Sequence, residues 1–256
     1  SGTVLLVAAL ERLPTLILEP NAEPGLANRW LGPFVDEAAC AWQETARYFG
    51  RKGVVTGNPV RESIFRVPPL ALPSETMQVL VFGGSQGSTI MNRAVVASLD
   101  RLEVYAGRIR LLHQTGPQDL ELVTKAYANS KISAEVTAYI DAMEEAYAGA
   151  DLVLSRAGAT TCAELAACGR PAILIPLPLG GGHQERNAEM MTRAGAAQFI
   201  PESSLDAELL SSELIRLLKA PGERMRMAER ARSIARPAAA RVVAERLLDL
   251  SERKAM

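Results

Sequence analysis

The chain has 256 residues, of which 48% are hydrophobic, and its 28 basic and 29 acidic residues leave a formal net charge of −1. This composition is sufficient for one large or two modest domains with real hydrophobic cores. A near-neutral chain lacks the large positive excess that is typical of nucleic-acid-binding proteins, so we expect no nucleic-acid partner.

The first part of the chain predicts an α/β domain, which we assign to 1–66. It opens on the apolar run 4–10, which no strand precedes. Because a complete α/β domain usually begins with its own strand, we expect further sequence upstream of Ser1. Strands are then predicted at 15–18, 35–42 and 53–56, and helices at 24–31 and 44–49. Strands that alternate with helices are typical of a parallel sheet covered by helices.

A proline-rich segment separates this domain from the next. Three prolines within 67–73 favour an extended, semi-rigid chain. We therefore place a linker at 67–76 and the domain boundary at its start.

The second α/β domain is predicted at 77–236. Its predicted strands are 78–82, 110–113, 135–140, 152–154, 172–176 and 198–200. Its predicted helices are 89–99, 119–127, 142–148, 161–167, 184–194, 207–218 and 224–233. The last of these carries much of an arginine cluster that we expect to form a solvated face, namely Arg224, Arg226, Arg230, Arg232 and Arg236.

A last amphipathic helix is predicted at 238–250, after Pro237. Its apolar residues share one face at helical spacing: Val242, Val243, Leu247 and Leu250. No apolar run in the chain approaches the ~20 residues needed to cross a bilayer, and no signal peptide is recognised.

Three unusual loops follow strands of the second domain, at the strand ends where open parallel sheets bind their ligands. The first is the glycine-rich segment 83–88. Its backbone amides and the following helix N-terminus suit a phosphate, and Ser85 can donate to a phosphate oxygen. A plain glycine turn between strand and helix is the alternative.

The second loop is 155–164, whose small residues expose backbone amides at a helix start, a setting that suits a diphosphate. Glu164 lies one turn into the helix, where a carboxylate can accept from two ribose hydroxyls. The alternative is a carboxylate that only stabilises the positive end of the helix dipole. Taken by itself, this segment favours that alternative.

The third loop is 177–187, which contains three consecutive glycines. His183 and Gln184 then present polar groups at a helix start, suited to sugar hydroxyls; a surface turn with a capping histidine is the alternative. The other histidine, His113, lies in an apolar strand, and we expect it to be a hydrogen-bonded core residue.

No metal site or resident cofactor is expected. The sequence has no Asp-x-Asp motif and no cluster of metal ligands. Its three cysteines, Cys40, Cys162 and Cys168, fit neither a paired zinc site nor a disulfide framework, which favours a reducing compartment. Without a metal ion, we expect backbone amides, a helix dipole and an arginine to stabilise the negative charge of a diphosphate.

Together these motifs resemble the MurG family, the bacterial transferases that move N-acetylglucosamine from UDP-N-acetylglucosamine onto lipid I to make lipid II. The similar segments occur in order along nearly the whole chain: 19–28, 56–61, 83–87, 139–143, 156–164 and 183–188. The resemblance implies a GT-B fold of two Rossmann-like domains with parallel sheets, of which the N-terminal one is incomplete here. It also implies that the helix within 237–256 crosses back to the N-terminal domain.

The resemblance further implies a role for several residues. Ile140 holds uracil through its backbone, Glu164 takes the ribose hydroxyls, and Ser85 and Arg61 lie near the diphosphate. The full implied donor site is Asn21, Arg61, Ser85, Gln86, Ile140, Ala159, Thr160, Thr161, Glu164, His183 and Gln184. The implied reaction is an inverting displacement of UDP by the acceptor hydroxyl. The implied partners are the UDP-sugar, lipid I and the inner face of the bacterial cytoplasmic membrane, with the protein peripheral there.

The chain departs from the family pattern near its start. The family tends to carry His-Glu-Gln-Asn where this chain has Leu18-Glu19-Pro20-Asn21. Leu18 has no polar side chain, and Pro20 lacks both a side-chain amide and a backbone donor. The family's usual region for the general base precedes the sequence, which leaves Glu19 as the candidate base. Two alternatives remain open: a donor-binding relative without catalysis, and a GT-B transferase for another glycolipid or natural-product acceptor.

Overall fold

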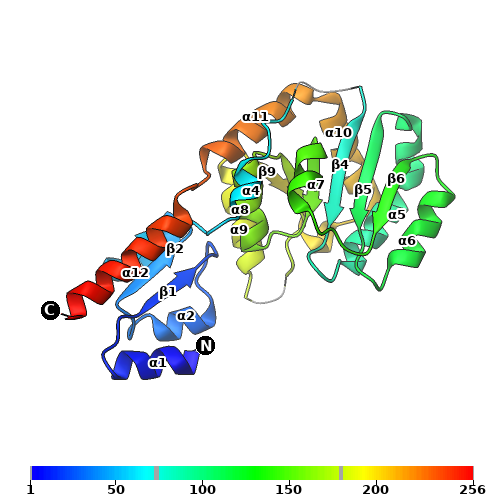
Figure 1. The fold of residues 1–256 in the computed structure, drawn as a ribbon. Helices are drawn as coiled ribbons and strands as arrows, with labels where there is room; N and C mark the ends of the chain where they lie inside the picture. The colour runs from blue at the N-terminus through cyan, green and yellow to red at the C-terminus, as the bar shows by residue number, and fades with distance from the viewer. Residues whose placement is uncertain (1, 72–74, 179–180, 256) are drawn as a thin grey trace.

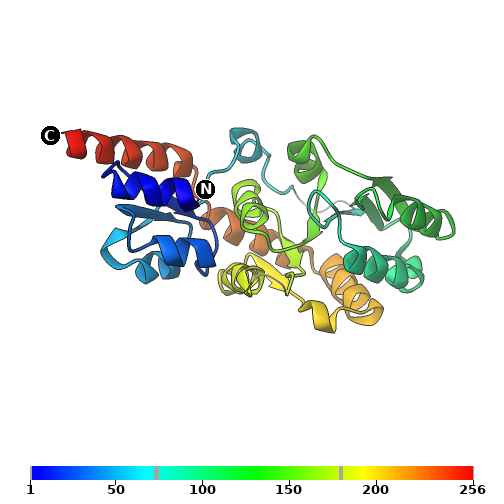
Figure 2. The same ribbon diagram turned by 90° about the horizontal axis from the view of Figure 1, so that it is seen from below.

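The structure is a computed structural model that describes residues 2–71, 75–178 and 181–255. Within those residues the strands form two parallel sheets, each in its own domain. Figure 1 shows the smaller domain, built from the start of the chain, beside the larger one, and Figure 2 shows the same arrangement from below. None of the helices in the described ranges is long and apolar enough to cross a membrane.

The smaller domain holds the sheet β1-β2-β3, all parallel. Its elements are α1 (Gly2–Leu10), β1 (Leu16–Glu19), α2 (Leu26–Leu31), β2 (Glu37–Cys40), α3 (Gln43–Tyr48), a 3-10 turn (Gly50–Lys52) and β3 (Gly53–Val55). The predicted strands and helices are confirmed, with β2 shorter than expected. The apolar run 4–10, to which no element was assigned, is the helix α1.

The larger domain follows the short helix α4 (Glu62–Phe65). Its strands are β4 (Met77–Phe82), β5 (Ile109–Gln114), β6 (Ser133–Thr137), β7 (Leu152–Ser155), β8 (Ala172–Leu174) and β9 (Ala197–Phe199). Its helices are α5 (Thr89–Leu102), α6 (Leu120–Ala128), α7 (Met143–Gly149), α8 (Ala159–Cys168), α9 (His183–Arg193), α10 (Ala207–Lys219) and α11 (Pro221–Ser233), with 3-10 turns at Glu103–Tyr105 and Glu202–Ser204. All predicted elements are present, but β6 ends at Thr137, so Ile140 lies in the loop beyond it.

The strand order of the larger sheet is β6-β5-β4-β7-β8-β9. The chain builds outward from β4 to β6 and then returns to the other side of β4 for β7, β8 and β9. The order therefore reverses between β4 and β7. In open α/β sheets the carboxyl ends of the strands at such a reversal form the ligand crevice.

The core of the larger domain lies on both faces of this sheet. Alternate residues of β4 point to opposite faces, because successive side chains of a strand do. Val79 and Val81 pack with α5 and α10, whereas Leu80 and Phe82 pack with α7 and α8. His113 of β5 is fully buried between Asn92 and Tyr127, which lie 3.0 and 3.1 Å from its ring nitrogens. The prediction of a core histidine is confirmed, and burial lowers its pKa to about 4.

The chain joins the larger core at Ile64, within the predicted domain 1–66, and at Val67, the first residue of the predicted linker 67–76. Ile64 and Val67 are buried in the cluster that also holds α7 and α8. Arg232 then donates to the Val67 carbonyl at 2.7 Å, and Arg170 donates to the Pro68 carbonyl at 3.1 Å. The start of the proline-rich segment is therefore fixed to the larger domain by two guanidinium groups.

The predicted solvated arginine face is wrong for two of its members. Arg224 is 3% exposed and donates to the carbonyls of Leu217 and Leu218 at the end of α10. Arg232 is half-buried and donates to Val67 and Cys168. Positive charge near the carbonyl end of a helix is favourable, which explains why these side chains turn inward.

The last helix, α12 (Ala239–Ala255), lies against the smaller domain (Figure 1). Arg246 donates to both carboxylate oxygens of Glu37 at 2.7 and 2.8 Å, a bidentate pair that fixes its geometry. Leu250 is buried, whereas Leu247, predicted on the same face, is 46% exposed. The chain thus ends on the domain in which it begins.

Candidate functional site

The loop 83–88 connects β4 to α5 at the reversal of strand order. Gly84 and Gly87 have φ values of +94° and +74°, a region that favours glycine. Gly87 also lies against the backbone of Thr115 at the end of β5, so closely that a Cβ atom would come within 1.9 Å of its carbonyl oxygen. Ser88 caps α5, its hydroxyl accepting from the Met91 amide at 3.5 Å. The glycines thus bring backbone amides and a helix N-terminus to the crevice.

Replacing Gly87 with alanine should destabilise the protein more than replacing Gly84. At Gly87 the methyl group meets Thr115 in addition to the backbone strain, whereas at Gly84 nothing lies within 4 Å. We expect a loss of about 3–4 kcal/mol for Gly87→Ala and about 1–2 kcal/mol for Gly84→Ala in urea unfolding. Equal losses in the two variants would contradict the close approach of this loop to β5.

The second loop connects β7 to α8, and Arg156 within it ties the neighbouring loops together. Its guanidinium donates to the Ser88 hydroxyl at 2.8 Å and to the Ile175 carbonyl at 3.1 Å, and it pairs with Glu202 at 2.5 Å. The side chain is buried. Arg156 therefore links the segments that follow β4, β7 and β8 and places a cation among them.

The third loop leads from β8 to α9, and its residues 179–180 lie outside the described ranges. Gln184 accepts from the Leu177 amide through its side-chain oxygen at 3.0 Å, which leaves its amide nitrogen for other partners. His183 is the first residue of α9, half-buried, after Gly182 with φ of +80°. The three loops predicted to lie together are indeed neighbours at one edge of the sheet.

Two adjoining cavities open at this edge. The larger, about 420 Å³, lies over the glycine loop and is lined by residues that include Gly84, Ser88, Arg156, Thr161 and Gln184. The second, about 290 Å³, is lined by Phe82, Gly84, Ser85, Gln114, Tyr139, Ile140, Met143, Thr160 and Glu164. Gly84 belongs to both. An elongated ligand can therefore extend from one cavity into the other across the loop.

Most of the predicted donor residues line these cavities. Ser85, Ile140, Thr160 and Glu164 line the second, and Thr161 and Gln184 line the first. Gln86 is exposed at the loop and belongs to neither lining.

Glu164 has two partners of different kinds. The Tyr147 hydroxyl donates to its Oε2 at 3.0 Å, and Arg61 Nη2 lies 3.8 Å from its Oε1. Burial raises the pKa of Glu164, while the Tyr147 hydrogen bond and the Arg61 charge oppose this shift. Arg61, which the resemblance puts near the diphosphate, thus lies beside the carboxylate. The Glu164 side chain is 14% exposed, so part of it reaches the cavity.

The smaller domain contributes a polar loop around Glu19. This carboxylate is 1% exposed and accepts from the Asn21 and Gly25 amides and from the side-chain amides of Asn21 and Asn28, all at 2.8–3.1 Å. Both oxygens are therefore occupied by the loop itself. The candidate base thus holds the chain that follows β1 in place, and its role as a base stays a prediction.

Asn187 of α9 bridges the two domains. Its side-chain oxygen accepts from the Ala22 amide at 2.8 Å, and its nitrogen donates to the Asn21 side chain and the Ala157 carbonyl, each at 3.1 Å. Asn187 is fully buried. Asn21, predicted to contact the donor, is therefore placed by α9, on which His183 and Gln184 lie. No role was predicted for Asn187, because an asparagine within a helix gives no signal of a distant partner.

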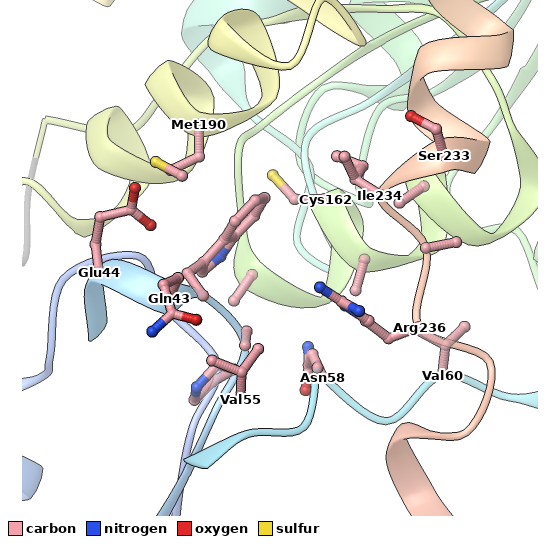
Figure 3. Close-up of a pocket in the computed structure, with 18 of the residues that line it drawn as sticks. Gln43, Glu44, Val55, Asn58, Val60, Cys162, Met190, Ser233, Ile234 and Arg236 are labelled. Carbon is pink, nitrogen blue, oxygen red and sulfur yellow. The ribbon is translucent and has the colours of Figure 1, made fainter. Parts of the chain in front are cut away.

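Another cavity, of about 290 Å³, lies between the domains near the segments that cross between them. Figure 3 shows Cys162 and Met190 of the larger domain facing Gln43 and Val55 of the smaller one. Ala159, a predicted donor residue, lines this cavity and neither of the two beside the glycine loop. Burial raises the pKa of Cys162 to about 12, so the thiol stays protonated near neutral pH.

Comparisons with known proteins agree with this geometry. The model for the glycosyltransferase family 28 C-terminal domain matches residues 78–243. The UDP-N-acetylglucosamine–N-acetylmuramyl-(pentapeptide) pyrophosphoryl-undecaprenol N-acetylglucosamine transferase of Anaeromyxobacter sp. (strain Fw109-5) is 44% identical over 99% of this chain and 68% of its own length.

Solved structures show the same arrangement. Acinetobacter baumannii MurG superposes with a TM-score of 0.82 at 29% identity, over 97% of this chain and 70% of that one. The UDP-GlcNAc 2-epimerase of Neisseria meningitidis, bound to UDP-GlcNAc, has a TM-score of 0.70 over 97% of this chain and 73% of its own. At 12% identity, the similarity to this second structure shows only that the fold is shared.

Proposed function

Since the chain belongs to the family of UDP-N-acetylglucosamine–N-acetylmuramyl-(pentapeptide) pyrophosphoryl-undecaprenol N-acetylglucosamine transferases, the MurG transferases, we propose that it moves N-acetylglucosamine from UDP-N-acetylglucosamine to lipid I. The product is lipid II, a step of peptidoglycan synthesis. The fold is the GT-B arrangement of two α/β domains that this family shares.

One observation carries the donor site: two cavities meet at the reversal of strand order, one over a glycine loop and one beside Glu164. We assign the diphosphate to the space between the loop 83–88 and the start of α8, where the amides at the N-termini of α5 and α8 favour negative charge. Uracil is assigned to the Ile140 backbone and the ribose hydroxyls to Glu164.

The sugar is assigned to the space between the larger domain and the loop after β1. Thr161 and Gln184 line the cavity on that side, and Asn21 approaches from the smaller domain. Ala159, Thr160 and His183 lie at the starts of the two helices that border this space. Donors from both domains thus surround the transferred sugar.

The reaction proposed is an inverting displacement. The acceptor hydroxyl attacks the anomeric carbon while a base takes its proton, the bond to the diphosphate breaks, and UDP leaves with its negative charge near the helix N-termini and Arg61. Stabilising that developing charge by preorganised donors is the main contribution of the larger domain. No resident metal or cofactor is part of this proposal. Glu19 acts in it as a positioning residue for the loop that carries Asn21.

The acceptor determines where the protein acts. The relatives' names specify a pyrophosphoryl-undecaprenol acceptor, whose long polyprenyl chain resides in a membrane. We therefore propose that the protein works as a peripheral protein on the cytoplasmic face of the bacterial membrane, with lipid I as its second substrate.

Two measurements test the proposal. Titration calorimetry should detect binding of UDP and UDP-N-acetylglucosamine, and absence of binding at millimolar UDP would refute the donor site. Transfer of labelled N-acetylglucosamine to a lipid I analogue should follow. Binding without transfer would favour a donor-binding relative, and transfer only to another acceptor would favour a different GT-B transferase.

A further inference from the structure

We propose that Tyr147 positions the donor's ribose by holding one oxygen of Glu164, so that the rest of the carboxylate faces the 2′ and 3′ hydroxyls. This inference rests on the donor site proposed above. It concerns a residue on α7 that has no exposed surface and lies behind the lining of the cavity that contains Glu164. Tyr147 acts on the ribose only through Glu164 of α8.

The contact is well defined. The Tyr147 hydroxyl donates to Glu164 Oε2 at 3.0 Å. Its ring packs edge-on against Phe82, with centroids 6.2 Å apart, and Phe82 also lines the cavity that contains Glu164. The tyrosine is therefore fixed by the core behind the cavity wall, and a fixed donor fixes the plane of the carboxylate that it binds.

The two oxygens of Glu164 then have separate tasks. Oε2 is committed to Tyr147, while Oε1 faces Arg61 Nη2 at 3.8 Å, beyond hydrogen-bond distance. Arg61 is more than half exposed, so its side chain can turn away without breaking a close contact. Oε1 and the second lone pair of Oε2 are thus available to a pair of neighbouring hydroxyls, which require a carboxylate of fixed orientation.

Charge supports the same assignment. The titratable groups that face Glu164 are Tyr147 and Glu144 on α7, Arg61 before α4, and Cys168 on its own helix. Burial raises the pKa of Glu164, and the Tyr147 hydrogen bond and Arg61 lower it. The pKa of Tyr147 itself lies well above its ordinary range, so its hydroxyl remains a donor. Removing that hydroxyl raises the pKa of Glu164, and the ionised form that binds ribose is then lost at a higher pH.

The test is Tyr147→Phe, with Tyr127→Phe as the matched control. Tyr127 is another buried tyrosine of the same domain, but its hydroxyl bonds His113. Calorimetry with UDP at pH 7.5 should show about tenfold weaker binding for Tyr147→Phe and unchanged binding for Tyr127→Phe. The preference for UDP over 2′-deoxyuridine diphosphate should fall, and the pH at which affinity drops should move upward, only in Tyr147→Phe.

A double variant separates positioning from general loss of structure. In a Glu164→Ala background, adding Tyr147→Phe should cause no further loss of UDP affinity, because the acceptor that the Tyr147 hydroxyl holds is already gone. A further loss would overturn the inference, as would wild-type affinity, preference and pH profile in Tyr147→Phe. Failure of the unaltered protein to bind UDP would instead refute the proposed function.

Discussion

Glu164→Ala should weaken UDP binding by about 100-fold or more, the largest effect that we expect from one side chain in the donor site. The change removes two hydrogen bonds from a charged acceptor to ribose, each worth about 1.5–3 kcal/mol. It also leaves the buried Tyr147 hydroxyl without the partner that it has at 3.0 Å. Titration calorimetry with UDP measures the loss directly.

The control for this prediction is Glu145→Ala. Glu145 lies on α7, two residues before Tyr147, and is exposed, so its replacement removes the same charge without touching the cavity that contains Glu164. Unchanged UDP affinity in Glu164→Ala would remove this residue from the ribose role. An equal loss in both variants would indicate an effect of net charge alone.

Glu19→Ala should have the largest effect on stability, a loss of about 3–5 kcal/mol in the smaller domain, because several hydrogen bonds to a charged acceptor are lost together. The replacement removes the buried charged acceptor that four half-buried donors share, and Asn28 keeps only its bond to the Leu18 carbonyl. Hydrogen exchange of the amides in the β1-β2-β3 ladder therefore measures the free energy of unfolding of the smaller domain.

Glu23→Ala is the matched control on the same loop. Its carboxylate is about one-third exposed and pairs with Arg29 and Arg186, contacts that contribute about 1 kcal/mol or less at a surface. Glu19→Gln distinguishes an organiser from a base. We expect it to destabilise the domain too, because an amide cannot accept at both ends. Full stability combined with loss of turnover would instead restore Glu19 as the catalytic base.

The alternation of strands and helices was predictable because each element is set by local patterns. Parallel strands buried on both faces give short apolar runs, and the helices between them give helical spacing. The apolar run 4–10 was the exception, since its uniform hydrophobicity has no period that separates strand from helix. The three loops of the donor site were also predictable, because their glycines mark turns at strand ends and the parallel topology gathers those ends on one edge.

Contacts across long stretches of sequence were not predictable. Asn187 lies 165 residues from Ala22, and nothing in the helix that carries it indicates a partner in the other domain. Arg224 and Arg232 look like members of a solvated face, yet they bind carbonyl groups at helix ends that only the packing brings within reach. Tyr147 looks like an ordinary core residue, because its bond to Glu164 depends on how α7 and α8 pack.

The bridge that Asn187 makes has a consequence for observing the two domains in solution. The Ala22 amide donates to Asn187 across the boundary at 2.8 Å, so it exchanges its hydrogen with water only when the domains part or the loop unfolds. The exchange rate of this one amide therefore reports how often the two domains separate. If a nucleotide slows the exchange at Ala22, the change in rate measures how much the ligand stabilises the contact between the two domains.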